Sequence, residues 1–398
     1  MRRGAWHQCG DRSQKLVEEQ LEQKAGVGVI ISPRDLSRKK AIAYAERYRA
    51  LGAELLLDHQ YYEPDFTNDR FDSYPISRFR KGVSSLNKIS DQDLTDFRNE
   101  LRIDHEDLKA DAVIAPAVVY QAGRADIVQL NARLFAAAKH VANDLKLPLY
   151  ATVVLGRSVT ASDQTLQTML SQATAFSCDG WYFGFEFEDD ERLPSVRETV
   201  RRCCVAGLTL ACTGKPVLHA YAGPMGLLSF GFGATGVAIG HSQNLWKFTR
   251  DRWMPTVSQG GGGNAPARFF SNALWGTIIY PDETSQLPPA IRNQVLTPSP
   301  FSGSVASNLP WTRWDSGKHL VYMLAKQVST MAVEKDPRKN AKTAISLLDR
   351  AISLHAAIQQ SNVFLADNTN AYQANWKAAL EDLLRDNQAD FEFFDLMS

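Results

Sequence analysis

The sequence predicts an α/β protein, a (β/α)8 TIM-like barrel with a C-terminal helical extension, and three observations support this fold class. Eight apolar, strand-like segments recur along the chain, and segments with apolar residues at helical spacing separate them. Together they span about 250 residues, the usual size of a closed barrel of this kind. The alternative, a doubly wound open sheet, requires a glycine-rich phosphate fingerprint that the sequence lacks.

Each predicted strand is a short apolar run, as expected for parallel strands that are buried on both faces. The eight runs are residues 27–32, 54–60, 112–120, 148–155, 181–188, 216–222, 235–240 and 274–280. The five predicted helices between them are residues 38–51, 91–108, 125–145, 162–175 and 195–211. In the third helix, Leu130, Leu134 and Val141 recur at helical spacing, which indicates one buried helix face.

The segments divide the chain into four predicted parts. Residues 1–26 form an N-terminal helix or extension, residues 27–286 the barrel, residues 287–314 a proline- and serine-rich linker, and residues 315–398 a helical region. Three helices are expected in the last part. Asp336 followed by Pro337 opens the middle one, because aspartate caps a helix and proline suits its first turn.

Composition limits the partners and the compartment. The 44 basic and 44 acidic residues cancel, so the net charge does not support binding to nucleic acid or to a membrane. Five scattered cysteines without a CxxC pair suit a reducing compartment and do not indicate a zinc site. There is no apolar signal sequence and no long apolar run. We therefore expect a cytoplasmic protein and predict neither a metal nor another cofactor.

The predicted strand at residues 181–188 is the most informative segment, because its side chains alternate sharply. Four aromatic residues share one face: Trp181, Phe183, Phe185 and Phe187. The other face carries Tyr182, Gly184, Glu186 and Glu188. Burying a carboxylate between two covered faces is costly, so Glu186 is the first candidate for a functional role.

Functional groups of such barrels lie at the C-terminal ends of the strands, and polar residues gather at those ends here. We assign Glu186 as general acid/base and Asp58 as the second carboxylate, with His219 and Tyr221 as further catalytic residues. The predicted substrate-binding residues are Glu188, Arg157, Tyr120, His241, Asn244 and Trp246. Because His219 and Tyr221 are two residues apart, they are expected to share a strand face.

The alternative for Glu186 is an internal ion pair with Arg157 or Arg124. The loop at residues 245–268 mixes aromatic and basic side chains, and a lid over the site is one interpretation of it. A subunit contact is another.

The run from Asp179 to Glu186, Asp-Gly-Trp-Tyr-Phe-Gly-Phe-Glu, resembles the strand of chitinase-type and endo-β-N-acetylglucosaminidase-type glycoside hydrolase barrels. In those families an Asp-Gly pair leads by fixed spacing to a catalytic glutamate. The resemblance implies that Glu186 is the proton donor.

Two hypotheses for the function follow from these features. The first is an enzyme that acts on a glycosidic or N-glycosidic bond of a small carbohydrate or nucleoside-like substrate. The second is a non-catalytic barrel that serves as a recognition or scaffold subunit and contacts partner proteins through its C-terminal helices.

Overall fold

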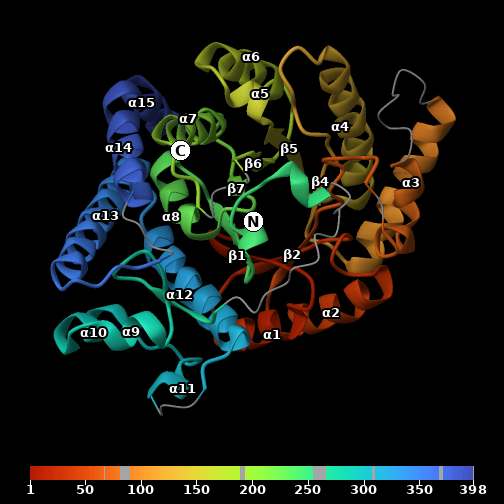
Figure 1. Ribbon diagram of the computed structural model, residues 1–398. Coiled ribbons are helices and arrows are strands. Elements are labelled where there is room, and N and C mark those ends of the chain that lie inside the picture. Colours follow the sequence, from red (N-terminus) through yellow and green to blue (C-terminus); the bar gives the residue numbers. More distant parts are fainter. Residues whose placement is uncertain are drawn as a thin grey trace.

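The protein folds as a closed barrel of eight parallel strands surrounded by helices, which confirms the predicted fold class (Figure 1). The computed structural model describes residues 1–66, 68–80, 90–188, 193–253, 266–306, 310–366 and 371–397. Within these ranges, none of the helices combines the length and the apolar character needed to cross a membrane.

The barrel strands follow one another around the ring in chain order, and β1 pairs with β8 to close it. Their bounds are β1 Gly4–Gln8, β2 Gly28–Ile31, β3 Glu54–Leu57, β4 Ala112–Ile114, β5 Leu149–Leu155, β6 Gly180–Phe185, β7 Val217–His219 and β8 Gly236–Ile239. Seven of the eight predicted strand segments overlap one of these strands.

The first and last barrel strands correct the predicted domain bounds. The barrel begins at Gly4 and not at residue 27, so residues 1–26 are no extension but contain β1 and the first helix. Residues 274–280, predicted as the eighth barrel strand, instead contain β10 (Gly276–Ile279), which pairs antiparallel with β9 (Arg268–Ser271). β1 escaped prediction because Gly-Ala-Trp-His-Gln is no apolar run, although all five of its residues are buried.

All five predicted helices are present, with bounds that differ from the prediction by two residues at most. The helices of the barrel are α1 Gln14–Glu22, α2 Arg38–Ala50, α3 Asp91–Leu108, α4 Ala125–Leu145, α5 Arg157–Thr160, α6 Asp163–Ala173, α7 Arg197–Ala211 and α8 Gly226–Ser229. Short 3-10 turns complete the connections: η1 Phe71–Ser73, η2 Pro75–Phe79, η4 Gly223–Met225, η5 Phe230–Phe232, η6 Gln243–Leu245 and η7 Arg250–Trp253.

Large side chains fill the lower part of the barrel in two layers. Neighbouring strands of a tilted barrel are shifted along the barrel axis by about one residue per strand. Inward-facing residues of alternate strands therefore lie at the same height and form a layer. The first layer consists of Trp6, Leu56, Tyr150 and Leu218, and the second of Ile30, Ile114, Tyr182 and Ala238. Gly28 and Gly180 leave the space that the rings of Trp6 and Tyr150 occupy. The floor of the barrel is therefore solid.

Strand β6 has the two-faced arrangement that its sequence predicts. Its four aromatic side chains (Trp181, Phe183, Phe185 and Phe187) are buried in the layer between the strands and the helices. Tyr182 belongs to the barrel interior, and Glu186 follows at the C-terminal end of the strand. The aromatic face thus anchors the strand against the helices, and side chains of the opposite face point into the barrel and toward its mouth.

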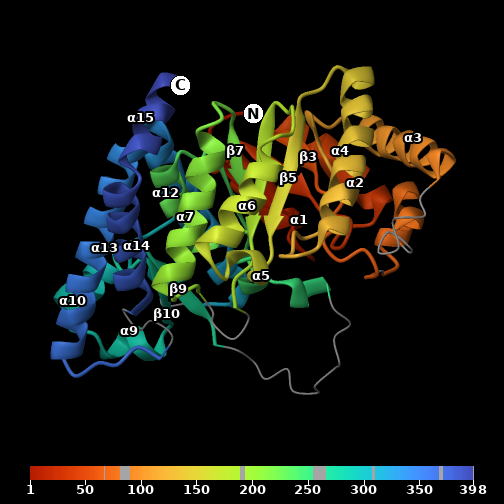
Figure 2. The ribbon, with the colours of Figure 1, turned by 90° about the horizontal axis from the view of Figure 1, so that it is seen from above.

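The C-terminal helices pack along one side of the barrel (Figures 1 and 2). The described residues of this region contain four helices, not the three predicted: α12 Arg313–Val333, α13 Pro337–Gln360, α14 Ala371–Asp386 and α15 Gln388–Met397. Helix α12 packs directly on β1 and β8, α13 packs outside α8, and α14 and α15 pack outside α7. Asp336 caps α13 as predicted, with its side chain accepting from the Arg338 N–H. Arg3, next to β1, donates to the carbonyls of Ala332 and Glu334 at the end of α12, so the two ends of the chain are joined.

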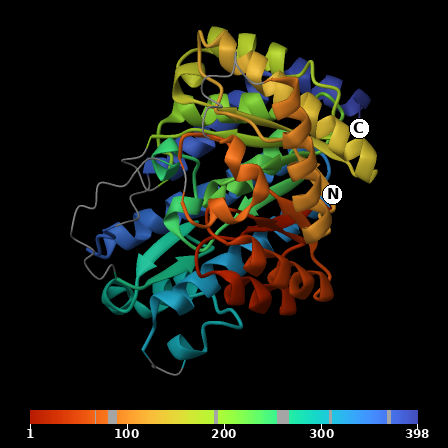
Figure 3. The same ribbon diagram turned by 90° about the vertical axis from the view of Figure 1, so that its right-hand side faces the viewer.

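The described residues of the predicted linker, 287–306 and 310–314, are a packed part of the fold. It contains α10 (Pro289–Val295) and α11 (Gly303–Ala306), and α9 (Asp282–Gln286) precedes it. Leu287 and Val295 are fully buried in a small apolar cluster beneath the β9–β10 hairpin. Figure 3 shows this teal segment projecting from one side of the barrel. The described residues of this segment therefore form a packed subdomain between the barrel and α12.

Candidate functional site at the barrel mouth

Asp58 lies just beyond β3, in the layer above the apolar floor, and is 2% exposed. Three tyrosine hydroxyls donate to its Oδ2 atom: Tyr62 at 2.8 Å, Tyr182 at 3.0 Å and Tyr221 at 3.3 Å. The backbone N–H of Gln60 donates to its Oδ1 atom at 2.9 Å. Asp58 and Tyr221, both predicted as catalytic, are thus in direct contact.

Burial dominates the ionisation of Asp58. Loss of solvent raises the pKa of its carboxyl group, and the hydrogen bonds from Tyr62, Gln60 and Tyr182 oppose this shift only in part. A carboxyl group with a raised pKa can hold a proton nearer neutral pH, which a general acid requires.

Four aromatic rings, contributed by Tyr62, Tyr221, Phe248 and Trp253, form a roof at the mouth. The Tyr62 ring centroid is 5.1 Å from both Phe248 and Trp253, and those two rings stack at 4.9 Å. The Phe187 N–H donates to the Phe248 carbonyl at 3.0 Å, which ties this roof to the end of β6. Residues 245–253 of the predicted lid therefore lie across the mouth, whereas residues 254–265 fall outside the described residues.

Several buried polar atoms at the mouth have no hydrogen-bond partner in the described parts of the chain. They are both amide atoms of Gln8, the Ser32 hydroxyl, Oε1 of Gln60, Nε and Nη1 of Arg252, and Nε1 of Trp253. Each belongs to a strand end or to the roof. Buried polar atoms are nearly always satisfied, so these atoms indicate a place for ordered water or a polar ligand.

The register of the strands brings Gln8 close to Asp58. Gln8 pairs with Ile30, and Ile30 pairs with Leu56. After correction for the barrel tilt, Gln8 and Asp58 occupy the same inward-facing layer. Sequence reasoning missed Gln8 because it missed β1.

Arg252 was noted in the sequence only as one of the loop's basic residues. Its guanidinium pairs with Asp35 and lies over the rings of Tyr221 and Trp253, with centroid distances of 5.6 and 5.4 Å. A positive charge is thus held beside the aromatic roof.

Glu186 lies at the end of β6 in an ion-pair network and is 3% exposed. Its carboxylate accepts from the Arg157 backbone N–H at 2.9 Å and from Nε of Arg250 at 3.2 Å. Arg250 also pairs with Glu63 at 3.0 Å, and Arg157 pairs with the exposed Glu188 at 2.8 Å. The alternative of an ion pair with Arg157 is therefore present. The Glu186 carboxylate is therefore held in place by two arginine residues.

Arg124, the other arginine considered for Glu186, pairs with Asp126 at the surface. The second arginine on Glu186 is instead Arg250, which η7 supplies.

His219 does not share a face with Tyr221, contrary to the prediction. Its Nδ1 atom is 2.7 Å from the Ser229 hydroxyl, and its ring packs against Phe183 and Phe232 on the outside of the barrel. Burial lowers the pKa of His219 to about 3, so the imidazole is neutral. Tyr221 has a φ of +52°, which interrupts the strand alternation and turns its hydroxyl to Asp58.

Four further predicted binding residues lie away from Asp58. Tyr120 is buried in the layer between strands and helices, and Asn244 is exposed, with its side chain bonded to the Ser242 hydroxyl. Trp246 donates to the Gly240 carbonyl and, together with His241, lines a separate pocket. These residues were predicted as binding residues because they lie at strand ends, but that position does not determine the direction in which a side chain points.

No cluster of three or more histidine, cysteine, aspartate or glutamate side chains suited to a metal ion occurs within the described ranges. The sequence matches no known protein-family model and no curated protein. The fold and the geometry of the mouth therefore carry the functional argument.

Proposed function

We propose that this protein is an enzyme that cleaves a glycosidic or N-glycosidic bond of a small polar substrate bound at the barrel mouth. The observation that carries the proposal is Asp58, a buried carboxyl group with a raised pKa that accepts hydrogen bonds from three tyrosine hydroxyls. Glu186 is the second carboxylate at the same end of the barrel. Two carboxyl groups in contrasting environments suit the two roles that such hydrolysis requires.

The contacts support an exchange of the roles expected from the sequence. Asp58 acts as the general acid and donates its proton to the leaving-group oxygen or nitrogen. Glu186, held in place by Arg157 and Arg250, stabilises the positive charge that develops on the sugar ring. Water adds to the anomeric carbon and its proton returns to Asp58, so the reaction is a simple hydrolysis. The resemblance to chitinase-type barrels had implied Glu186 as the proton donor.

The unpartnered polar atoms supply the substrate contacts in this proposal. Gln8 offers both atoms of its amide group, Gln60 its amide oxygen, Ser32 a hydroxyl, and Arg252 and Trp253 N–H donors. A ligand with several hydroxyl or ring N–H groups can satisfy donors and acceptors together. Because Asp58 is nearly inaccessible beneath the aromatic roof, the substrate enters only when residues 245–253 move aside.

The test is hydrolysis of a panel of nucleosides and p-nitrophenyl glycosides by the full chain. We expect release of sugar or nitrophenol from at least one substrate, and a loss of about 10²–10⁴-fold in kcat/KM for Asp58→Asn. Asp126→Asn, at a surface carboxylate paired with Arg124, is the matched control and should retain activity. Full activity in a folded Asp58→Asn protein, or no turnover across the panel, would refute the proposal.

The second candidate is a non-catalytic recognition or scaffold barrel. The complete pairing of Glu186 with Arg157 and Arg250 favours it, because a purely structural carboxylate would have the same contacts. On α15, Phe393 is 50% and Leu396 83% exposed, a surface suited to a protein partner. The Glu186→Gln variant separates the two: the enzyme would lose turnover, whereas a scaffold would change only in stability.

A further inference from the structure

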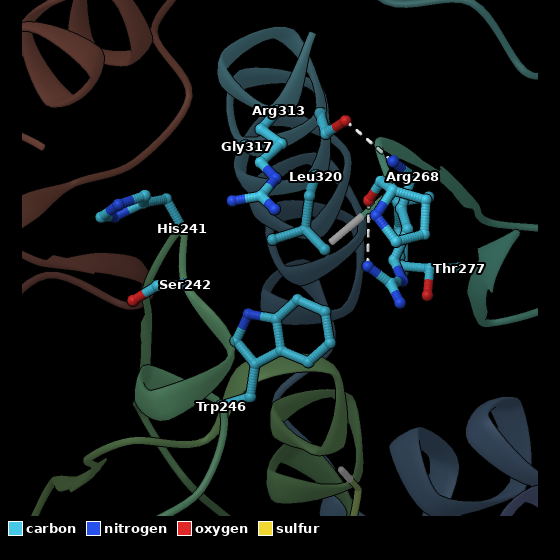
Figure 4. A pocket seen from close by; sticks show the side chains of 11 residues that line it. His241, Ser242, Trp246, Arg268, Thr277, Arg313, Gly317 and Leu320 are labelled. Atoms are coloured by element: carbon cyan, nitrogen blue, oxygen red, sulfur yellow. Dashed lines mark hydrogen bonds between the residues drawn. The ribbon is translucent and has the colours of Figure 1, made fainter. Parts of the chain in front are cut away.

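A second cavity, which we call the α12 pocket, lies beside the barrel mouth. Its volume is about 210 Å³, and three elements line it: the loop after β8, the β9–β10 hairpin and the first turns of α12. Figure 4 shows His241 and Ser242 on one side, Arg268 and Thr277 on the other, and the Arg313 side chain between them. None of these residues contacts Asp58, so the pocket is distinct from the mouth.

The lining is basic. Arg268 and Arg313 contribute guanidinium groups, and the lining residues include no carboxylate. The N-terminal end of the 21-residue helix α12 adds the positive end of its dipole. Asp315 is in the first turn of α12, but its carboxylate is bonded to Thr312 in a capping box. The charge of the pocket therefore suits an anion.

The donors outnumber what a small carboxylate can accept. Besides the two guanidinium groups, Thr277 offers a hydroxyl, and Nδ1 of His241 has no hydrogen-bond partner in the described parts of the chain. The Ser242 hydroxyl already donates to the Asn244 side chain, and one Arg268 N–H donates to the Pro266 carbonyl at 3.0 Å. Burial lowers the pKa of His241, so its ring is neutral and can donate or accept. A tetrahedral oxyanion with three or four oxygens can engage this set more fully than two carboxylate oxygens can.

The remaining lining is apolar and fixes the size of the ligand. Trp246, Phe270 and Leu320 face the cavity, which is smaller than the roughly 300–1,000 Å³ of sites for drug-sized ligands. The space suits a phosphate with a few attached carbon atoms, and it is too small for a dinucleotide.

We propose that the α12 pocket binds the phosphate group of a small phosphorylated molecule. Arg268 and Arg313 hold the phosphate oxygens, His241 donates from the loop after β8, Thr277 donates from β10, and Trp246 contacts the organic part. Barrels of this fold frequently bind phosphate between the loops after the last two strands and a helix N-terminus. The proposal does not depend on the proposed hydrolytic function.

Isothermal titration calorimetry of the full chain tests it with three probes: inorganic phosphate, ribose 5-phosphate and ribose. At constant ionic strength we expect saturable phosphate binding, tighter binding of ribose 5-phosphate, and weaker binding of ribose than of its phosphate. Arg313→Gln and Arg268→Gln should each weaken phosphate binding at least tenfold. Arg350→Gln, at an exposed arginine of α13, is the matched control and should bind as the parent does.

Arg313 is itself exposed, so its replacement leaves the core intact and a loss of binding reports on the pocket. Phosphate binding no stronger than chloride binding would overturn the proposal. So would equal affinity in both arginine variants and the control. Loss of phosphate binding in Asp58→Asn would move the anion to the barrel mouth and would also overturn it.

Discussion

Four buried histidines should make the protein sensitive to mild acid. Burial lowers the pKa of His7, His105 and His319 from 6.5 to about 4, and that of His219 to about 3. In the unfolded chain these side chains titrate near 6.5. Protonation therefore favours the unfolded state, and stability is lost as the pH falls from about 6.5 toward 4.

The expected loss is large compared with the total stability. One pH unit below 6.5, each histidine costs about 1.4 kcal/mol, because the unfolded state binds a proton that the folded state refuses. Four such groups lower the free energy of unfolding by roughly 5 kcal/mol at pH 5.5. Since domains are stable by only about 5–15 kcal/mol, partial unfolding should begin between pH 5 and 6.

The measurement is the free energy of unfolding in urea at pH 7.5 and at pH 5.5, followed by tryptophan fluorescence. His219→Gln keeps a polar partner for Ser229 and should reduce the difference between the two pH values by about 1.4 kcal/mol. His140→Gln, at an exposed histidine of α4, should leave the difference unchanged. If the protein is equally stable at both pH values, the histidines are not held neutral and the reasoning is wrong.

Three further predictions concern the barrel interior, each measured by denaturant unfolding. Asp58→Asn should gain stability relative to the parent as the pH rises above 3.8, by up to about 1.4 kcal/mol per unit, because burial raises the pKa of Asp58; a pH-independent difference would contradict this. Trp6→Ala should lose about 3–5 kcal/mol by opening a cavity in the floor, and a loss below about 1 kcal/mol would mean that the floor is not packed as described. Gly180→Ala should lose about 1–3 kcal/mol or more, because its methyl group overlaps the Tyr150 ring, whereas Gly303→Ala, with no atom within 4 Å, should not; equal effects would refute the clash.

The fold class was predictable because buried parallel strands and amphipathic helices have strong patterns. Each of the five predicted helices has a buried face, and seven strand segments are apolar runs. Strand β1 has no such pattern, since Trp6 and Gln8 face the barrel interior and His7 faces outward beneath Ala25. The apolar run that contains β10 was indistinguishable from a barrel strand, because apolarity reports burial and not the direction of pairing.

The site was predictable only where a side chain follows the regular alternation of its strand. Asp58 and Glu186 do so, and both lie at the predicted end of the barrel. Tyr221 reaches Asp58 through a left-handed backbone conformation that no period-two pattern contains. The partners Arg250 and Arg252 come from the segment after β8, whose path across the mouth depends on tertiary contacts alone.

The position of β1 has a consequence for how the protein is made. Its neighbours β2 and β8 lie far apart in the chain, and Arg3 bonds to the end of α12, more than 300 residues away. During synthesis the ring cannot close until β8 has emerged, so one edge of the growing sheet stays unpaired. Contacts of such long range slow folding and expose nascent chains to aggregation. Truncation of the chain before α12 should therefore reduce the yield of folded protein more than it reduces the activity of the molecules that do fold.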